Sequence, residues 1–278
     1  MTTVATSKKH LVIFTDLDGT LLDFGTYAWA AARPALDRLR EKRIPLVLCS
    51  SKTKSEIEAV RKAINNRDPF ISENGGGIFV PEDYFQFTWA FDRRIEGYKV
   101  IEPGMPYARL RKALQTIVRD TGLELKGYGD LSVGEVAAHT GLSADQARRA
   151  KQRDYDEPFI LAGNPDQQQR VLEMIVKQGL RWTKGSRYYH LTGDNDKGQA
   201  VRIVTGLFEQ KFKTVATAAL GDSPNDLPML AIADYPILVQ RPDGRHDETM
   251  RLPHLLHADG IGPVGWNSAV LKLLNDYK

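Results

Sequence analysis

The stretch LVIFTDLDGTLLD, residues 11–23, is the most informative segment of this chain, because a short apolar run in it ends at two closely spaced carboxylates. The run Leu11–Phe14 suits a buried strand of a parallel sheet, and Asp16 and Asp18 follow beyond its carboxyl end. Binding and chemistry collect at that edge of open α/β sheets, and Gly19 allows a tight turn beside the acids. Because two buried acids repel each other without a cation, the pattern predicts a hard divalent metal, of which Mg²⁺ best suits oxygen ligands.

A second acidic segment, Gly221-Asp222-Ser223-Pro224-Asn225-Asp226, repeats this pattern far downstream. It follows the strand-like run Thr214–Leu220 and leads into a predicted helix. Taken alone, such a segment also fits an ordinary N-capping turn. Together with the two upstream acids, it predicts one acidic site at the strand ends. Lys197 opens the helix before that strand; a lysine there is usually solvated, but in this setting it is the cation placed to hold an anionic substrate.

Strands and helices alternate up to about residue 66, which predicts an α/β fold with a doubly wound parallel-sheet (Rossmann-like) core. The pattern then changes to an inserted α+β cap domain, in which Ser143 is an expected helix N-cap. We therefore expect core residues 1–81 and 188–278, with the cap at 82–187. At the start of the cap, an alternation of aromatic residues fits a strand. These residues are Tyr84, Phe85, Phe87, Trp89 and Phe91.

The bulk composition is that of an ordinary globular protein of 278 residues, with 42% hydrophobic and 26% charged residues. The net charge of +3 slightly favours small anionic substrates and is too low for a nucleic-acid-binding face. The single cysteine, Cys49, falls in a predicted core strand and excludes an internal disulfide. Because no apolar run has the length of a signal-peptide core or a transmembrane helix, we expect a cytoplasmic protein with no membrane or nucleic-acid partner.

The acidic segments resemble the motifs of the haloacid dehalogenase superfamily of phosphatases, and the resemblance spans nearly the whole chain. Its motifs, in the family's order, are matched by Asp16-Leu17-Asp18-Gly19-Thr20, Ser50, Lys197 and the segment 221–226. Glu73-Asn74-Gly75 is also typical of the capped (type IIB) branch. The resemblance implies phosphate-ester chemistry in the core and substrate selection in the cap.

Within that superfamily, the closer resemblance is to the mannosyl-3-phosphoglycerate phosphatases. It rests on Val47-Leu48-Cys49-Ser50-Ser51-Lys52-Thr53, on Arg153-Asp154-Tyr155-Asp156-Glu157-Pro158-Phe159, and on Tyr189-His190-Leu191-Thr192-Gly193. The implied substrate is a small phosphorylated sugar-glycerate.

The resemblance implies hydrolysis through a phospho-aspartate. Asp16 is the implied nucleophile, and Asp18 protonates the leaving oxygen and then deprotonates the attacking water. Mg²⁺ would be held by Asp16, by the backbone carbonyl of Asp18, by Asp222 and by Asp226. Ser50 and Lys197 complete the implied catalytic set by binding phosphoryl oxygens.

A wider set of residues is expected to bind substrate. Arg149 and Arg153, at helical spacing, share a face in this interpretation, because a glycerate carboxylate needs a cation. Sugar hydroxyls favour an acidic partner such as Glu157, while a lone histidine such as His190 is more often structural. The full set of expected substrate-binding residues is Ser50, Lys52, Asn225, Arg149, Arg153, Glu157, Arg187 and His190.

Other activities fit the same core motifs. In the capped branch, the alternatives are phosphatases acting on glucosyl-3-phosphoglycerate or sucrose phosphate, and a phosphomutase would transfer the phosphoryl group within its substrate. A phospho-aspartate signalling receiver also combines a strand-end aspartate, a lysine and a serine or threonine on a doubly wound sheet. A receiver needs neither a leaving-group acid such as Asp18 nor a cap, so the sequence favours the phosphatase.

Overall fold

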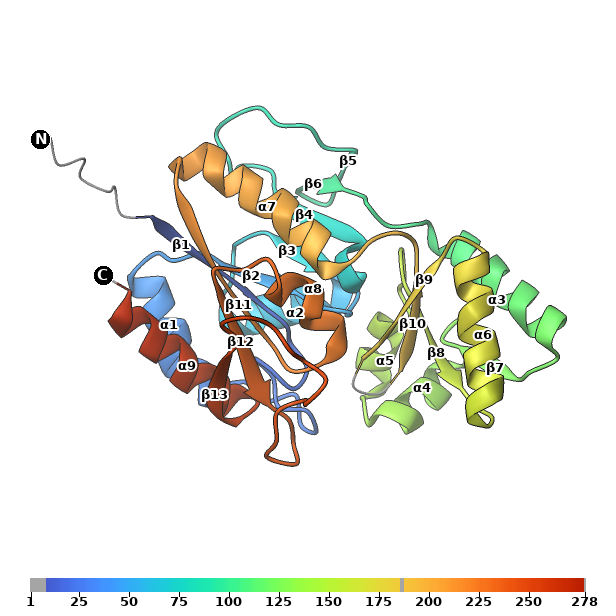
Figure 1. Ribbon diagram of the computed structural model, residues 1–278. Helices are drawn as coiled ribbons and strands as arrows, with labels where there is room; N and C mark the ends of the chain where they lie inside the picture. Colours follow the sequence, from blue (N-terminus) through green and yellow to red (C-terminus); the bar gives the residue numbers. More distant parts are fainter. Residues whose placement is uncertain (1–8, 186–187, 278) are drawn as a thin grey trace, which may run out of the picture.

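The computed structural model describes residues 9–185 and 188–277, and a large mixed sheet forms its core (Figure 1). The strands of this sheet are β1 (His10–Thr15), β2 (Leu46–Cys49), β3 (Phe70–Ser72), β4 (Gly77–Pro81), β5 (Arg93–Ile95), β6 (Tyr98–Ile101), β11 (Val215–Gly221), β12 (Tyr235–Gln240) and β13 (Leu256–Ile261). Their order is β13-β12-β11-β1-β2-β3-β4-β6-β5. Neighbouring strands pair parallel from β13 to β3, and the remaining pairs are antiparallel.

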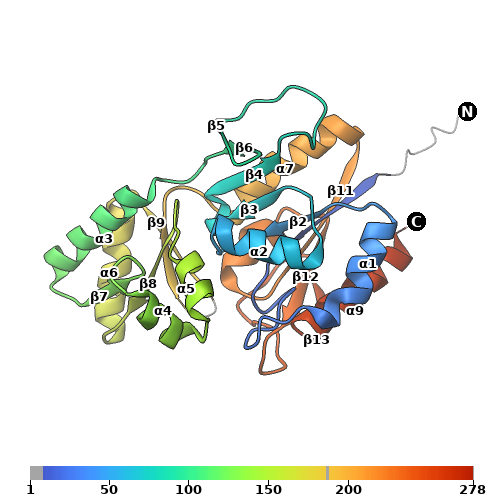
Figure 2. The same ribbon diagram turned by 180° about the vertical axis from the view of Figure 1, so that it is seen from behind.

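Helices cover both faces of the sheet, which confirms the doubly wound core. They are α1 (Arg33–Glu41), α2 (Lys54–Ile64), α7 (Lys197–Phe212), α8 (Leu227–Leu230) and α9 (Pro263–Asp276). Side chains of α1, α2 and α9 share one buried cluster with Leu11 and Ile13, whereas those of α7 and α8 share a second cluster with Val12 and Phe14. The period-two alternation along β1 thus gives each face its own apolar layer. Figure 2 shows α1 and α2 in front of the sheet.

The cap is a smaller sheet with helices around it (Figure 1). Its strands are β7 (Leu125–Gly127), β8 (Glu157–Leu161), β9 (Arg181–Lys184) and β10 (Tyr189–Thr192), and its helices are α3 (Tyr107–Thr121), α4 (Val133–Thr140), α5 (Ala144–Ala150) and α6 (Pro165–Lys177). The sheet order is β7-β8-β10-β9, with antiparallel pairing. Ser143 caps α5 in a capping box with Gln146, as the sequence predicts.

The sheets divide the chain differently from the expected domain boundaries of 1–81, 82–187 and 188–278. β5 and β6 extend the core sheet beyond residue 81, because β6 pairs with β4. Conversely, β10 lies between β8 and β9 in the cap sheet, although it follows residue 187. The strand β13 was not predicted from the sequence; it extends the parallel edge of the core beside β12.

The aromatic residues between β4 and β5 do not form the expected strand. They lie in an irregular segment whose rings pack on the buried cluster below α7. Phe85, for example, lies 5.3 Å from the ring of Phe208 in α7. Their alternation therefore reflects packing against a helix and not pairing in a sheet. No helix in the described residues is both long and apolar enough to cross a membrane.

Candidate active site

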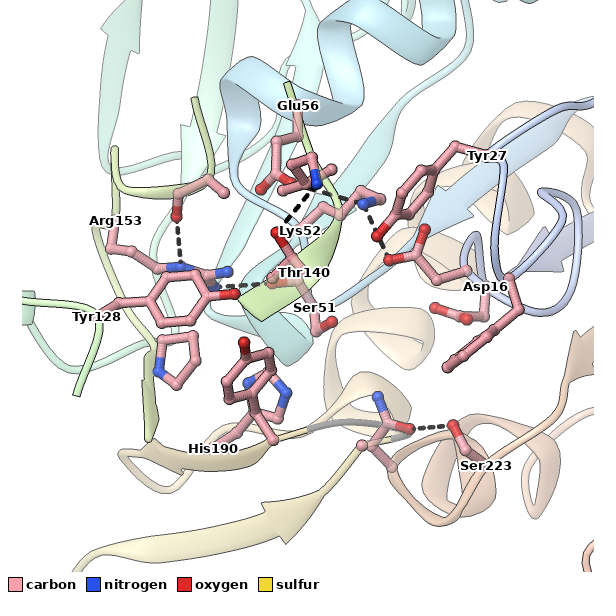
Figure 3. A pocket seen from close by; sticks show the side chains of 18 residues that line it. Asp16, Tyr27, Ser51, Lys52, Glu56, Tyr128, Thr140, Arg153, His190 and Ser223 are labelled. Carbon is pink, nitrogen blue, oxygen red and sulfur yellow. Dashed lines mark hydrogen bonds and ion pairs between the residues drawn. The ribbon is translucent and has the colours of Figure 1, made fainter. Parts of the chain in front are cut away.

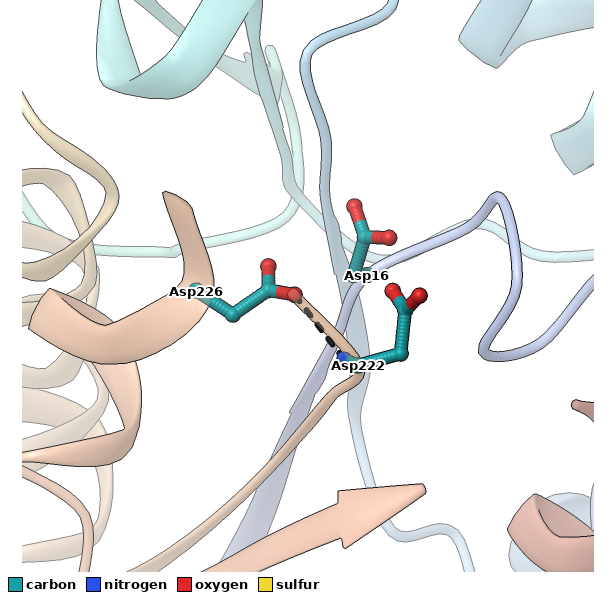
Figure 4. Close-up of side chains that lie close together, drawn as sticks. All are labelled: Asp16, Asp222 and Asp226. Carbon is teal, nitrogen blue, oxygen red and sulfur yellow. Dashed lines mark hydrogen bonds between the residues drawn. The ribbon is translucent and has the colours of Figure 1, made fainter. Parts of the chain in front are cut away.

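Three aspartates meet at the carboxyl edge of the parallel strands (Figure 4). Asp16 follows β1, Asp222 follows β11, and Asp226 ends the short 3₁₀ turn η3 (Pro224–Asp226). The two strands end side by side, because they pair in parallel with Thr15 opposite Leu220. Oxygen atoms of the three carboxylates, one from each, all lie within 4.8 Å of one another. The structure thus brings together acids from two segments that are distant in the sequence.

Backbone geometry fixes this cluster. The Oδ2 of Asp226 accepts hydrogen bonds from the backbone N–H groups of Asp222 (3.0 Å) and Ser223 (3.1 Å). A Cβ at Gly221 would lie 2.5 Å from the Cγ of Asp226. Gly19, at a φ of +80°, lies under Asp222, where a Cβ would approach Oδ2 to 2.8 Å. Both glycines are therefore required for the acids to approach so closely.

Lys197, the first residue of α7, is buried between two of these acids. Its Nζ donates to the Oδ1 of Asp16 (2.7 Å) and to the Oδ1 of Asp226 (2.6 Å). Burial disfavours the ammonium charge, but the two carboxylates outweigh this effect and raise the pKa of Lys197. Its side chain is therefore the positive charge within the acidic cluster.

The acids nevertheless outnumber this charge. Burial raises the pKa of Asp16 to about 7, although Lys197 opposes the shift. Burial also raises the pKa of Asp222 well above its ordinary value, with further contributions from Asp226 and Asp16. Three buried carboxylates and one lysine leave an excess of negative charge, and a divalent cation with oxygen ligands fits such a donor set.

Asp18 points to the other side of the same turn, towards Lys52. The Nζ of Lys52 lies 2.9 Å from the Oδ2 of Asp18 and 3.5 Å from the Oε1 of Glu56. Burial disfavours the ammonium charge of Lys52, but these two carboxylates outweigh that effect and raise the pKa of Lys52. The Oδ1 of Asp18 is buried and has no hydrogen-bond partner among the described residues. Asp18 therefore presents an acceptor atom while Lys52 holds its other oxygen.

Three further polar residues of the core, Ser50, Thr20 and Asn225, have local partners. Ser50, directly after β2, is buried, and its Oγ accepts a hydrogen bond from the backbone N–H of Lys52 (3.3 Å). Thr20 donates its hydroxyl to the Oδ1 of Asp222 at 3.3 Å. Asn225, expected to bind substrate, donates to the Oδ1 of Asn74 at 3.1 Å.

A pocket lies between these core residues and the cap (Figure 3). Its core wall includes Asp16, Asp18, Tyr27, Ser51, Lys52, Glu56, Ser223 and Asn225, and its cap wall includes Tyr128, Thr140, Leu142, Arg153, Pro158, Gly185, Tyr188 and His190. Asp16 and Asp18 therefore face a wall of aromatic, hydroxyl and cationic side chains. Figure 3 shows Tyr128 and His190 across the pocket from Asp16.

Arg153 lines this pocket, but not from the expected helix. Because α5 ends at Ala150, Arg153 lies in the segment between α5 and β8, and the expected helical face shared with Arg149 is wrong. Its Nη1 donates to the backbone carbonyl oxygen of Ser51 (2.8 Å), and its Nε donates to that of Ala150 (3.0 Å). Arg149 is exposed and lines a neighbouring groove beside Lys52.

His190 and Glu157 have different surroundings, although their strands β10 and β8 are neighbours. His190 lines the pocket, with its Nδ1 2.9 Å from the Oδ2 of Asp156. Glu157 is buried inside the cap, where its Oε1 accepts hydrogen bonds from the Nη1 of Arg111 (2.7 Å) and the N–H of Gly129 (3.1 Å). It is not part of the pocket wall, so the structure does not support its expected contact with a sugar. Arg187 lies outside the described residues.

The turn η2 (Glu73–Gly75) lies between the core strands β3 and β4 and contacts the cap, a role that was not expected from the sequence. The Glu73 carboxylate accepts hydrogen bonds from the backbone N–H groups of Asp154, Tyr155 and Asp156, at 2.9–3.1 Å. Asn74 donates to the Oδ2 of Asp156 at 2.6 Å. The segment Glu73-Asn74-Gly75 was identified from the sequence as typical of the capped branch, but its contacts with residues 154–156 depend on how the cap packs against the core.

Known proteins resemble this chain in both sequence and structure. The family model described as haloacid dehalogenase-like hydrolase matches residues 13–101. A glucosyl-3-phosphoglycerate/mannosyl-3-phosphoglycerate phosphatase of Methanococcoides burtonii is 51% identical over 96% of this chain and 97% of its own. A protein of the same description from Persephonella marina is 41% identical, over 96% of this chain and 98% of its own.

Solved structures share the fold at low sequence identity. BT1666, a haloalkanoate-superfamily phosphatase from Bacteroides thetaiotaomicron, has a TM-score of 0.66 at 17% identity, covering 99% of this chain and 97% of its own. The subclass IIB sugar phosphatase BT4131 has a TM-score of 0.64 at 15% identity, covering 95% and 98%.

Proposed function

Because the chain belongs to the haloacid dehalogenase-like hydrolases and is a phosphoric monoester hydrolase, we propose that its substrate is mannosyl-3-phosphoglycerate. The products are mannosylglycerate and phosphate. Two relatives that match nearly the whole chain act on mannosyl- and glucosyl-3-phosphoglycerate by their descriptions. The glucosyl compound is therefore the second candidate substrate. The observation that carries the proposal is the acidic cluster facing a pocket whose other wall bears Arg153 and His190.

In the proposed reaction, Asp16 attacks phosphorus and the ester P–O bond breaks, so that the phosphoryl group is carried on the Asp16 carboxylate. Asp18, whose Oδ1 is free of hydrogen bonds from the described residues, gives a proton to the leaving glycerate oxygen. It then takes a proton from the water that attacks phosphorus and regenerates Asp16. Lys197 and Ser50 bind phosphoryl oxygens during both steps.

The proposed metal ligands are Asp16, Asp222 and Asp226, with the backbone carbonyl of Asp18. Lys197 bridges Asp16 and Asp226, because its Nζ donates to both carboxylates. A backbone N–H group after β11 also holds Asp226 in place. The Asp18 carboxylate stays outside the cluster because it pairs with Lys52. Bound Mg²⁺ supplies positive charge that offsets the acids and the phosphate.

A phosphate-release assay on a substrate panel tests this proposal. The panel contains mannosyl- and glucosyl-3-phosphoglycerate, sucrose phosphate, 3-phosphoglycerate and p-nitrophenyl phosphate. We expect kcat/KM to be highest for the two glycosyl-3-phosphoglycerates. A preference for sucrose phosphate, or transfer of phosphate within a substrate without its release, would contradict the proposal.

A further inference from the structure

A chain of buried hydrogen bonds links the acidic cluster to the cap. The Oγ of Ser223 donates to the Oδ1 of Asn225 (2.8 Å), and the Nδ2 of Asn225 donates to the Oδ1 of Asn74 (3.1 Å). The Nδ2 of Asn74 donates to the Oδ2 of Asp156 (2.6 Å). The same carboxylate oxygen lies 2.9 Å from the Nδ1 of His190. All five side chains are buried, so the chain runs through the protein interior from the catalytic turn to the pocket's cap wall.

The donors and acceptors of this chain assign a role to the Nδ1 of His190. The Oδ2 of Asp156 accepts a hydrogen bond from the Nδ2 of Asn74, so we assign the Nδ1 of His190 as a second donor to the same carboxylate. The other ring nitrogen, Nε2, is then the atom that can meet a ligand. A Cβ at Gly185 would lie only 3.1 Å from this Nε2, and both residues line the pocket. The glycine thus leaves space beside Nε2.

The wall around His190 suits a sugar. The rings of Tyr128 and Tyr188 meet edge to face, with centroids 5.2 Å apart, and Thr140 adds a hydroxyl group. Aromatic faces and hydroxyl groups match the apolar faces and hydroxyls of a pyranose. The guanidinium of Arg153, by contrast, suits the glycerate carboxylate better than the sugar. His190 therefore lies on the part of the wall that fits the sugar.

The turn that carries Asn74 has an unusual backbone. Glu73, Asn74 and Gly75 have φ values of 49°, 54° and 89°, so three successive residues occupy the left-handed region. Such a conformation is costly for residues other than glycine and persists only where surrounding contacts hold it. Here Glu73 binds the backbone of the segment that carries Asp156, while Asn74 binds its side chain. Both contacts fix Asp156 relative to the core.

We propose that Asp156 and Asn74 are positioning residues for His190, and that the Nε2 of His190 forms a hydrogen bond with a hydroxyl group of the substrate's sugar. The inference rests on the proposed function and identifies the residue that reads the sugar. It predicts that one hydrogen-bond network holds both His190, which contacts the sugar, and the turn that carries Asp226.

The test compares mannosyl-3-phosphoglycerate with 3-phosphoglycerate, which keeps the phosphate and the carboxylate but lacks the sugar. His190→Ala should lower kcat/KM about tenfold for the first substrate, mainly through KM, and less than about twofold for the second. Asp156→Asn and Asn74→Gly should have the same selectivity. Asn74→Gly removes the donor to Asp156, tolerates the φ of 54° and places no second carboxylate beside Asp156. Asp154→Asn is the matched control, since its side chain is exposed in the same segment.

Positioning is tested by combining changes. Asp156 also faces Arg153, with 3.9 Å between its Oδ2 and the Nη1 of Arg153, and any effect through Arg153 should reach both substrates, because both carry the carboxylate. In a His190→Ala background, Asp156→Asn should therefore leave the ratio of kcat/KM for the two substrates unchanged. A further change in this ratio would overturn the positioning role, and equal losses on both substrates from His190→Ala would overturn the sugar contact. If His190→Ala does not fold by circular dichroism, His190→Gln replaces it. Wild-type protein that leaves both glycosyl-3-phosphoglycerates intact overturns the proposed function and this inference together, whereas active wild-type protein with unaffected variants overturns the inference alone.

Discussion

The core and the cap hold their functional side chains in different ways. In the core, Asp16 stands at a strand end and Lys197 at a helix start, and Asp226 is held by backbone N–H groups of its own turn. In the cap, Arg153 and His190 depend on the other domain: one donates to the carbonyl oxygen of Ser51, and the other reaches Asn74 through Asp156. The side chains of the core cluster are held by contacts within the core, whereas those of the cap wall are held by contacts between the cap and the core.

This difference predicts two classes of variant. Changes in the core cluster should affect every phosphate ester equally, because all substrates share the phosphate. Changes in the cap wall should separate substrates according to what they carry beyond the phosphate. A core variant that separates substrates, or a cap variant that affects them all equally, would contradict this division.

The largest expected effect is that of Asp16→Asn. An amide cannot attack phosphorus, so we expect kcat to fall on the order of 10⁴-fold or more for every substrate in the panel. The amide has nearly the same shape, so the circular dichroism spectrum should be unchanged. Near-normal phosphate release by this variant would remove Asp16 from the role of nucleophile.

Metal removal should have the next largest effect. Since the three carboxylates outnumber Lys197, exhaustive chelation should lower activity at least roughly 100-fold on all substrates, and Mg²⁺ should restore it. Asp222→Ala should raise the Mg²⁺ concentration needed for half-maximal activity. Thermal unfolding with and without Mg²⁺ provides a second readout, because a ligand that binds the folded state raises Tm. Full activity after chelation would contradict the proposed metal site.

The core arrangement could be predicted because it depends on local rules. A buried apolar run followed by acids places those acids at a strand end, and parallel strands end at one edge of the sheet. Asp16 and Asp222 therefore lie close together as expected, and this could be predicted without knowing any contact between distant residues. The strand that carries His190 could not be assigned in this way, because its place between β8 and β9 follows from pairing across the cap.

The directions in which the cap side chains point could not be predicted from the sequence either. Glu157 was expected in the pocket, but Arg111, 46 positions earlier, pairs with it inside the cap. Arg153 was placed on a helix that ends before it, because charged residues at helical spacing do not show where a short helix stops. In both cases the deciding partner is distant in sequence: Arg111 for one residue and the Ser51 carbonyl for the other.

The variant Arg153→Ala tests whether the cap wall selects substrates by their carboxylate. If its guanidinium binds the glycerate carboxylate, we expect kcat/KM for mannosyl-3-phosphoglycerate to fall about tenfold to a hundredfold, since a charge-assisted hydrogen bond contributes roughly 1.5–3 kcal/mol. Hydrolysis of p-nitrophenyl phosphate, which has no carboxylate, should change little. Arg148→Ala is the matched control, because Arg148 is exposed on α5 and pairs with Asp145. Equal losses on both substrates would mean that Arg153 supports docking through Ser51 instead.

The last expected effect is on stability and not on activity, and it concerns the junction of the two domains. Burial raises the pKa of Glu73 from its ordinary 4.5 to about 8, although Arg153 and the backbone N–H groups of the cap segment oppose the shift. Because this pKa is higher in the folded than in the unfolded chain, the folded state binds more protons between these values, and the free energy of unfolding falls as pH rises from about 4.5 to 8. The slope is at most about 1.4 kcal/mol per pH unit for one group. Glu73→Gln is neutral at every pH, so its urea-unfolding free energy should lack this component even if the variant is less stable throughout. Parallel stability curves for the wild type and Glu73→Gln between pH 5 and 8 would show that Glu73 is ionised in the docked state, and that the carboxylate holding the cap to the core is charged.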